Sequence, residues 1–139
     1  MMATTARLGP MLNAVDPDLS TFRANGGKLL MYHGWSDQNI APRNTIGYVE
    51  RVAARLGPDS GDMLRLFMVP GMRHCEGGPG FRAFDALAAL EAWVETGKAP
   101  STILGTNPES GLSRPLCAYP TVVRFTSGDA TDPGSFTCR

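Results

Sequence analysis

Two short apolar runs separated by an amphipathic segment constrain the fold of this chain more than any other feature. Residues 28–33 and 63–69 are mostly apolar, and each is bounded by glycine, proline or polar residues. Uninterrupted runs of this length are typical of strands that are covered on both faces in a parallel sheet. Between them, residues 42–56 carry apolar side chains at intervals of three and four and end at Gly57, which predicts an amphipathic helix. We therefore expect a strand, helix, strand unit with a right-handed crossover.

The second half of the sequence predicts one further helix and an irregular end. A glycine-rich loop at residues 71–80 precedes a helical pattern over residues 81–95. The expected apolar stripe of this helix consists of Ala83, Phe84, Leu87, Leu90 and Val94. Residues 101–139 are rich in proline, glycine, serine and threonine, so we expect a looped C-terminal cap. One or two edge strands are expected in it, near residues 102–104 and 121–125.

A short helical turn is expected before the first strand, and the chain is expected to form one domain. Asp16 is placed to cap this turn, with Pro17 at its first position and Phe22 inside it. The 139 residues contain no repeat with the period of a solenoid and have the length of a single domain. The predicted fold class is α/β, with a partial parallel sheet made of one βαβ unit plus a helix, and a looped cap.

Charge and hydropathy exclude two classes of partner. Thirteen basic and thirteen acidic residues leave no net charge, so the chain lacks the basic surface on which binding to nucleic acid or anionic membrane depends. Its apolar runs are much shorter than the roughly 20 residues that span a bilayer. Residues 1–8 contain no apolar stretch long enough for a signal peptide. We therefore expect no nucleic acid, no membrane and no export signal in the chain as it stands.

Two residues with acid and base chemistry follow the two predicted strands. Asp37 lies just past residues 28–33, and His74 lies just past residues 63–69. Ligands of an open parallel sheet bind outside the carboxyl ends of its strands, so both side chains are expected at one rim. The α/β-hydrolase triad has the chain order serine, acid, histidine, and Asp37 and His74 obey that order as orienting acid and general base. The alternative is that Asp37 makes a turn and His74 is a solvated loop residue.

The nucleophile of such a triad is not found by motif. The strained turn that carries it requires Gly-x-Ser-x-Gly. Ser36 and Ser113 each have the first glycine, at Gly34 and Gly111, but neither has the second. Ser36 is also one residue from Asp37 instead of on a separate strand. We therefore expect these residues alone to be inactive unless another chain supplies the nucleophile.

Segments around both residues, and along most of the chain, match the pattern of a known family. They are His33-Gly34-Trp35-Ser36-Asp37, Gly71-Met72-Arg73-His74-Cys75, Gly78-Pro79-Gly80, Leu12-Asn13-Ala14, Asp16-Pro17-Asp18-Leu19, Asn44-Thr45, Arg114-Pro115-Leu116-Cys117, Pro120 and Phe136-Thr137-Cys138. Together they resemble the C-terminal part of the tannase and feruloyl esterase family, secreted serine esterases with an α/β-hydrolase catalytic domain. The resemblance implies hydrolysis of aromatic carboxylic esters, such as galloyl or feruloyl esters. It implies Asp37 as the triad acid and His74 as the triad base.

The three cysteines bear on compartment and pairing. Cys117 and Cys138 flank the β-prone end and would close a loop there, contributing about 3 kcal/mol to stability if oxidised. Cys75, next to His74, is then left over, and an odd count in an exported protein indicates a partner elsewhere. The resemblance implies that partner, a cysteine preceding the nucleophilic serine, and a secreted or periplasmic protein. The alternative is three reduced thiols in a cytoplasmic protein, if a chain without a signal peptide is the complete gene product.

A metal site and a phosphate loop are rival interpretations of the same residues. His33, Asp37, His74 and Cys75 include zinc-competent ligands. However, a histidine at the end of a buried strand is more commonly satisfied by backbone groups, and the adjacent His74 and Cys75 cannot easily bind one ion together. Residues 77–80 lack the Gly-Lys-Ser/Thr ending of a P-loop, so a plain turn is expected. We predict no metal and no cofactor.

A non-enzymatic module is the remaining alternative. A truncated product that keeps part of the fold would serve as a binding or scaffold domain. Two parallel strands alone make an unstable sheet, and open apolar edges invite pairing with another chain. We therefore predict that the isolated chain is a homodimer, or that a strand from elsewhere in the molecule completes its sheet.

Overall fold

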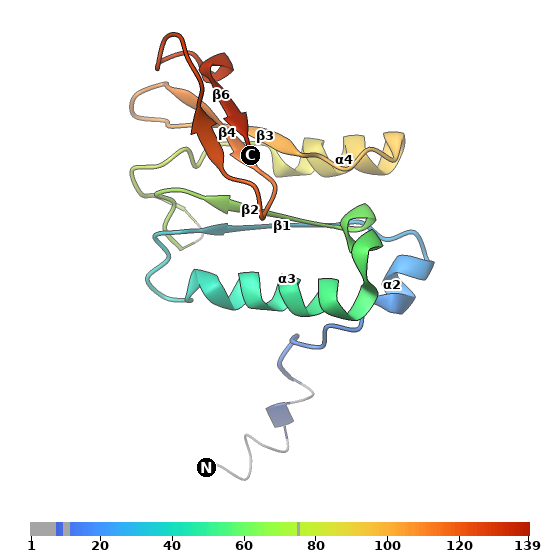
Figure 1. Ribbon diagram of the computed structural model, residues 1–139. Coiled ribbons are helices and arrows are strands. Elements are labelled where there is room, and N and C mark those ends of the chain that lie inside the picture. Colours follow the sequence, from blue (N-terminus) through green and yellow to red (C-terminus); the bar gives the residue numbers. More distant parts are fainter. Residues whose placement is uncertain (1–7, 10–11, 75) are drawn as a thin grey trace.

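A central pair of parallel strands lies between two layers in the computed structural model, which describes residues 8–9, 12–74 and 76–139. The elements are α2 (Ser20–Ala24), β1 (Leu29–Gly34), α3 (Pro42–Leu56), the 3₁₀ helix η1 (Pro58–Asp62), β2 (Leu64–Val69), α4 (Ala86–Thr96), β3 (Thr102–Thr106), β4 (Ser113–Cys117), β5 (Val123–Phe125), the 3₁₀ helix η2 (Pro133–Ser135) and β6 (Phe136–Cys138). Figure 1 shows α3 on one face of the β1–β2 pair and α4 with β3 and β4 on the other. None of the helices in the described ranges combines the length and the apolar character needed to cross a membrane.

The predicted strand, helix, strand unit is confirmed. β1 and β2 pair in parallel, with Leu29 opposite Leu64 and Gly34 opposite Val69, so their carboxyl ends are level. The connecting helix α3 has the bounds that the sequence predicts, because it begins with a proline and ends at Gly57, whose φ of 81° suits glycine. The acidic and basic residues that follow the two strands therefore emerge at one end of the sheet.

Two apolar clusters hold the three layers together. On the α3 side, Val52 packs with Leu64 at the start of β2. On the opposite side, Phe67 and Val69 of β2 pack with Leu116 of β4, and all three are buried. β2 thus contributes side chains to both clusters, as expected for a strand that is covered on both faces.

The two strands differ at their outer edges. The edge of β2 is covered, because Tyr119 N–H donates to the carbonyl of Leu66 at 2.7 Å and Ala118 forms a bridge with Phe67. No strand in the described ranges pairs with the outer edge of β1. Tyr32 of β1, the register partner of the buried Phe67, is 49% exposed. The expectation that residues 28–33 are buried on both faces is therefore wrong for Tyr32, whose ring packs edge-on against Phe84 and is otherwise exposed.

The helix after the glycine-rich loop begins later than predicted. α4 starts at Ala86 instead of residue 81, because the carboxylate of Asp85 caps it by accepting from the N–H of Ala88 at 2.8 Å. Before the cap, Ala83 is extended and forms a bridge with Thr106 of β3. The predicted helical pattern therefore included a segment that belongs to an extended connection.

The predicted apolar stripe of this helix is only partly right, because Phe84 packs against the buried cluster of β2 but lies before the start of α4. Trp93 is its buried residue, whereas Leu87 and Val94 are exposed. The helix is apolar on more than one side, so the 3.6-residue period alone could not select the buried face.

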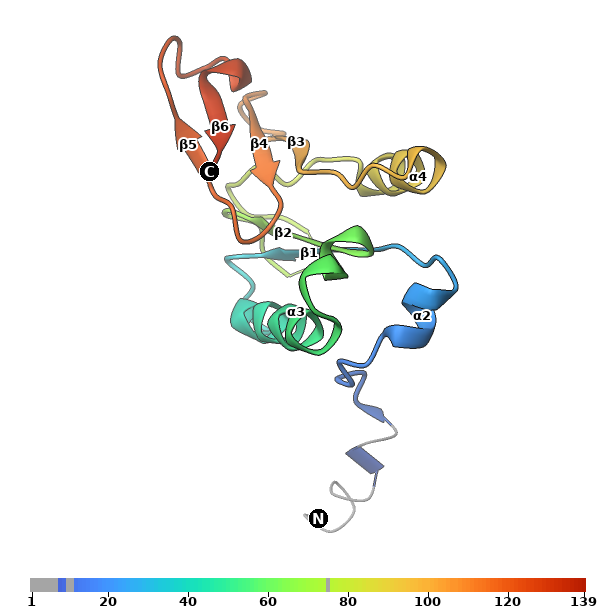
Figure 2. The ribbon, with the colours of Figure 1, turned by 45° about the vertical axis from the view of Figure 1, so that its right-hand side comes forward.

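Residues 101–139 contain more strand than predicted. β3 pairs with β4 and β5 with β6, each pair antiparallel, where one or two edge strands were expected. The predicted Cys117–Cys138 disulfide joins the end of β4 to β6, and Figure 2 shows the β5–β6 hairpin beside β4. β4 contains Pro115, and β5 and β6 have three residues each. Neither composition nor alternation is informative over such short segments.

The first helical turn lies later than predicted as well. α2 begins at Ser20 with Leu19 in the capping position. Asp16, the predicted cap, instead accepts from the N–H of Asp18 at 2.9 Å in a turn before the helix.

Candidate active site

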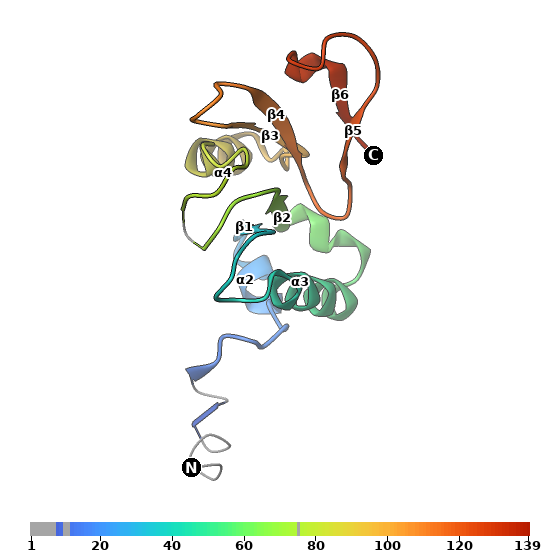
Figure 3. The ribbon, with the colours of Figure 1, turned by 90° about the vertical axis from the view of Figure 1, so that its left-hand side faces the viewer.

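The carboxyl ends of β1 and β2 bring Asp37 and His74 into contact. Figure 3 looks onto this end of the sheet, where the loops after the two strands lie side by side. Oδ2 of Asp37 lies 2.8 Å from Nδ1 of His74. An ionised carboxylate can only accept, so His74 donates through Nδ1–H, and in its neutral form Nε2 is the nitrogen free to accept a proton. The two residues that the sequence singled out thus form one acid and base pair.

Backbone contacts between the two loops fix this arrangement. Trp35 N–H donates to the carbonyl of Val69 at 2.9 Å, and Ser36 N–H donates to the carbonyl of Met72 at 3.0 Å. A Cβ added to Gly34 would lie 2.1 Å from that Met72 oxygen. Only glycine therefore lets the loop that carries the acid approach the loop that carries the base.

The glycine-rich loop after β2 folds back on its own beginning. A Cβ on Gly80 would lie 1.8 Å from the carbonyl oxygen of Pro70. Pro70 and Gly80, at the two ends of the loop, are therefore in backbone contact, and His74 lies in the segment of sequence that joins them. Within the segment 77–80, for which a plain turn was expected, the backbone bends at residues 78–80. Extended residues then separate the loop from α4.

Both oxygens of the Asp37 carboxylate are held by donors. Oδ1 accepts from the backbone N–H groups of Asn39 at 2.8 Å and Ile40 at 2.9 Å. Oδ2 faces His74 and also Nε2 of His33, at 3.0 Å. Burial by itself would raise the pKa of the Asp37 carboxyl, but the Ile40 N–H, the His74 hydrogen bond and the Asn39 N–H outweigh it and hold that pKa well below its usual range. Asp37 is therefore an anion at neutral pH.

His33 joins this contact, which the sequence did not predict. A histidine satisfied by backbone groups was the expected case. Instead, Nδ1 of His33 lies 2.6 Å from Oγ1 of Thr45 in α3, and Nε2 faces Asp37, while the carbonyl of Ile40 is farther away, at 3.3 Å. The available sequence signal was position, because His33 comes immediately before the glycine that closes β1 and shortly before the acid.

The acid is enclosed and the base is accessible. The Asp37 side chain is 5% exposed and that of His74 is 35% exposed. Together with His33, both line a cavity of about 370 Å³. The rest of the lining consists of Tyr32, Gly34, Ile40, Met72 and Arg73. A substrate in this cavity could reach His74 without solvent access to Asp37, which suits a general base with a buried orienting acid.

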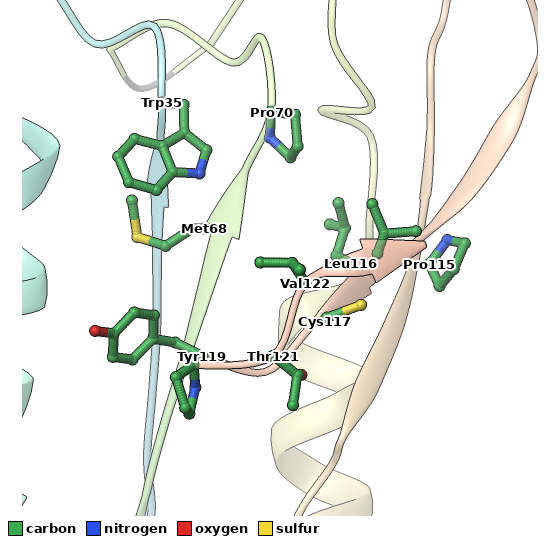
Figure 4. A pocket seen from close by; sticks show the side chains of 11 residues that line it. Trp35, Met68, Pro70, Pro115, Leu116, Cys117, Tyr119, Thr121 and Val122 are labelled. Atoms are coloured by element: carbon green, nitrogen blue, oxygen red, sulfur yellow. The ribbon is translucent and has the colours of Figure 1, made fainter. Parts of the chain in front are cut away.

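A second, smaller cavity lies beside β2. It has a volume of about 140 Å³ and is lined mainly by apolar side chains. Figure 4 shows Trp35 and Pro70 at one end of it and Tyr119 at the other. Trp35 belongs to the loop that carries Asp37, yet its side chain lines this cavity and not the one around His74. None of the 11 lining residues is charged, and neither Asp37 nor His74 is among them.

The two candidate serines do not line the cavity of the pair. Ser113 lies in β4, and its hydroxyl is 2.9 Å from Oγ1 of Thr106. Neither Ser113 nor Ser36 is among the residues that line the cavity of His74. Cys75 lies outside the described residues. Within residues 8–9, 12–74 and 76–139, no group of three histidine, cysteine, aspartate or glutamate side chains is arranged to hold a metal ion.

Comparison with known proteins finds a family that the whole chain matches. The whole chain, residues 1–139, matches the family model described as tannase and feruloyl esterase. It is 43% identical over 132 residues to the mono(2-hydroxyethyl) terephthalate hydrolase of Piscinibacter sakaiensis, in an alignment that covers 90% of this chain and 22% of that protein.

Two solved structures show the same fold over nearly the whole chain. An esterase from Aspergillus oryzae superposes with a TM-score of 0.86 at 34% identity, covering 99% of this chain and 32% of that one. Feruloyl esterase B from Aspergillus oryzae superposes with a TM-score of 0.82 at 30% identity, covering 90% of this chain and 29% of that one. The chain thus spans between 22% and 32% of the length of these relatives.

Proposed function

The chain belongs to the tannase and feruloyl esterase family, and we propose that it supplies the acid and the base of a carboxylic-ester hydrolase. Asp37 is the triad acid and His74 the triad base. The observation that carries this proposal is the 2.8 Å contact between Oδ2 of Asp37 and Nδ1 of His74 at the carboxyl ends of adjacent parallel strands. This is the place and the chain order that an α/β-hydrolase triad requires.

The chemistry assigned to the pair is proton transfer in two acyl-transfer steps. Nε2 of His74 takes the proton of a hydroxyl nucleophile as its oxygen attacks the ester carbonyl, and returns that proton to the departing alcohol. A water molecule then attacks the acyl-enzyme, with His74 again as base, and releases the acid and the free hydroxyl. Asp37 holds Nδ1–H throughout and stabilises the imidazolium that forms twice in the cycle.

The nucleophile is proposed to come from outside residues 1–139. These residues contain no Gly-x-Ser-x-Gly. The part of the chain that the structure describes places no serine, cysteine or threonine in the lining of the His74 cavity. We therefore expect no ester hydrolysis by residues 1–139 alone, and we assign them to the C-terminal part of a catalytic domain.

The outer edge of β1 is the proposed docking site for the segment that carries the nucleophile. Among the described residues no strand pairs with this edge, and Tyr32 on β1 is half exposed. A parallel strand added there would extend the sheet next to the strand that precedes Asp37. A second copy of this chain would compete for the same edge, so the isolated chain is expected to dimerise.

The proposed substrates are esters of aromatic carboxylic acids. The relatives with the names quoted above act on a terephthalate monoester and on feruloyl esters, and both are esters in which the acyl group is an aromatic acid. The Cys117–Cys138 disulfide supports an oxidising compartment, since such bonds persist in secreted and periplasmic proteins. The proposal is therefore a secreted or periplasmic esterase for aromatic acyl groups.

Mixing the chain with a serine-bearing fragment tests this function. The purified 139-residue chain is assayed with p-nitrophenyl acetate and methyl ferulate, alone and together with the N-terminal segment of a family relative that carries its nucleophilic serine. We expect hydrolysis only in the mixture, and a loss of about 10³-fold or more with His74→Ala. Hydrolysis by the chain alone that depends on His74 would refute the external nucleophile. Equal hydrolysis by mixtures with and without His74 would refute the role of the base.

A further inference from the structure

Two histidines share one carboxylate oxygen at the site. Oδ2 of Asp37 lies 2.8 Å from Nδ1 of His74 and 3.0 Å from Nε2 of His33. A Ser-His-Asp triad requires only the first of these contacts. The second histidine is well enclosed, with a side chain that is 11% exposed, so its polar atoms depend on protein partners.

The proton on His33 can be assigned from its partners. The Asp37 carboxylate can only accept, so the hydrogen that faces it is on Nε2 of His33. Nδ1 of a neutral His33 is then an acceptor, and the group within reach is the hydroxyl of Thr45, at 2.6 Å. Hydrogen bonds therefore run in one direction, from Thr45 to His33 and from His33 to Asp37.

Thr45 anchors this chain of hydrogen bonds to a rigid element. It lies in the first part of α3, which Pro42 starts and whose Val52 is packed against the sheet. The carboxylate of Asp37 is thus held from two sides. Backbone N–H groups of its own loop bind Oδ1, and an imidazole fixed by the helix binds Oδ2.

We propose that His33, held by Thr45, is a positioning residue that fixes Oδ2 of Asp37 and thereby keeps His74 in the tautomer with hydrogen on Nδ1. Only that tautomer leaves Nε2 of His74 free to take a proton from a nucleophile. Which nitrogen of a histidine carries hydrogen is set by the hydrogen bond that its other nitrogen makes. A carboxylate free to rotate away would release His74 to the other tautomer. The catalytic meaning of this arrangement rests on the proposed function, whereas the hydrogen bonds themselves do not.

Among the described residues, the cavity lining adds two other ionisable groups to the pair and His33. The cavity that His33, Asp37 and His74 line also contains the side chains of Tyr32 and Arg73. Neither of these two described residues forms a hydrogen bond with Asp37. Asn39, Ile40 and the two histidines do. Among the described residues, His33 is therefore the side chain whose removal leaves Oδ2 with His74 alone.

Nitrogen-15 NMR of the histidine side chains in the 139-residue chain tests the proposal. The chain has only two histidines, His33 and His74, and long-range proton to nitrogen-15 spectra at alkaline pH report which ring nitrogen of each carries hydrogen. We expect the Nε2–H tautomer for His33 and the Nδ1–H tautomer for His74. Thr45→Val removes the hydroxyl with little change of shape and is expected to cause partial loss of the Nδ1–H tautomer of His74. Thr45→Ser keeps the hydroxyl and is expected to restore it.

The variants separate a positioning role from a merely structural one. Circular dichroism first establishes that Thr45→Val and Thr45→Ser are folded to the same extent, and His33→Phe provides the larger perturbation if it folds. An unchanged His74 tautomer in Thr45→Val would overturn the proposal, as would the same loss in Thr45→Ser. Because this readout needs no ester hydrolysis, a failure of the proposed esterase activity leaves the test of His33 intact.

Discussion

β1 and β2 are paired in one register and both come from mostly apolar runs, yet their surroundings differ. β2 sends side chains into two buried clusters, and its outer edge is covered by Ala118 and Tyr119. β1 has a half-exposed Tyr32, and no strand in the described ranges lies at its outer edge. The apolar pattern shows that a strand is suited to burial, but not whether the residues that bury it lie in the same segment of the protein. We interpret the outer edge of β2 as covered by this segment of the protein, and the outer edge of β1 as the edge at which a further strand pairs.

The largest expected contrast is between two residues that face each other across the strands. Phe67→Ala removes a fully buried ring from β2 and is expected to lower the free energy of unfolding by about 3–5 kcal/mol. Tyr32→Ala, its register partner on β1, is expected to cost about 1 kcal/mol, mainly through its edge contact with Phe84. Urea unfolding of both variants measures the difference. Equal losses would show that β1 and β2 are equally buried in solution and would break the comparison.

The disulfide holds the cap that covers the edge of β2. The double variant Cys117→Ala/Cys138→Ala is expected to lose about 3 kcal/mol, because the bond closes a loop with a sequence separation of 21. It is also expected to self-associate more strongly, since a looser cap would make the edge of β2 resemble that of β1. Urea unfolding and light scattering, each with and without reductant, measure both effects. Reductant should change the stability of the wild-type chain only, and a double variant as stable as the oxidised chain would contradict the prediction.

Gly34 at the end of β1 and Gly47 in α3 form a matched pair of glycines. Gly34→Ala places a methyl group against the carbonyl oxygen of Met72 and is expected to cost about 1–3 kcal/mol and to separate Asp37 from His74. Gly47→Ala, inside α3 with its nearest neighbour at 3.6 Å, is expected to gain about 0.5–1 kcal/mol. Urea unfolding and the His74 NMR signals report stability and site geometry. An unperturbed His74 in Gly34→Ala would show that the close approach of the two loops is not required.

The smallest expected effect is a pH dependence of stability that comes from Asp37, in the loop after β1. The pKa of Asp37 is lowered in the folded chain, so its contribution to stability is fully present above the unfolded value of about 3.9 and is lost as the pH falls through the lower folded pKa. The difference in unfolding free energy between wild type and Asp37→Asn should therefore shrink as the pH falls below about 4. A difference that grows toward acid would mean that the folded carboxyl has a raised pKa.

The helix that the sequence predicted correctly has a sequence signal at each of its ends. α3 begins and ends as predicted because Pro42 and Gly57 mark its limits and its apolar face is flanked by charge. The meeting of Asp37 and His74 follows from topology, since both come after parallel strands of one pair.

The parts that could not be predicted depend on contacts between different elements of the structure. The buried face of α4 is chosen by Trp93 and its neighbours, because the helix is apolar on several sides. The partners of His33 lie in the next loop and in the next helix, and its role is set by side chains that no spacing rule connects. The exposure of β1 depends on what lies beyond its open edge.

A double-mutant cycle in the complemented chain tests the central claim that Asp37 and His74 act as one acid and base pair. Values of kcat/KM for methyl ferulate would be measured in mixtures with the serine-bearing fragment, for wild type, Asp37→Asn, His74→Ala and the double variant. We predict losses of about 10³- to 10⁴-fold for each single variant and no larger loss for the double variant, because residues that act as a unit are not additive. A double variant whose loss is the product of the two single losses, or single variants with full activity, would contradict the account.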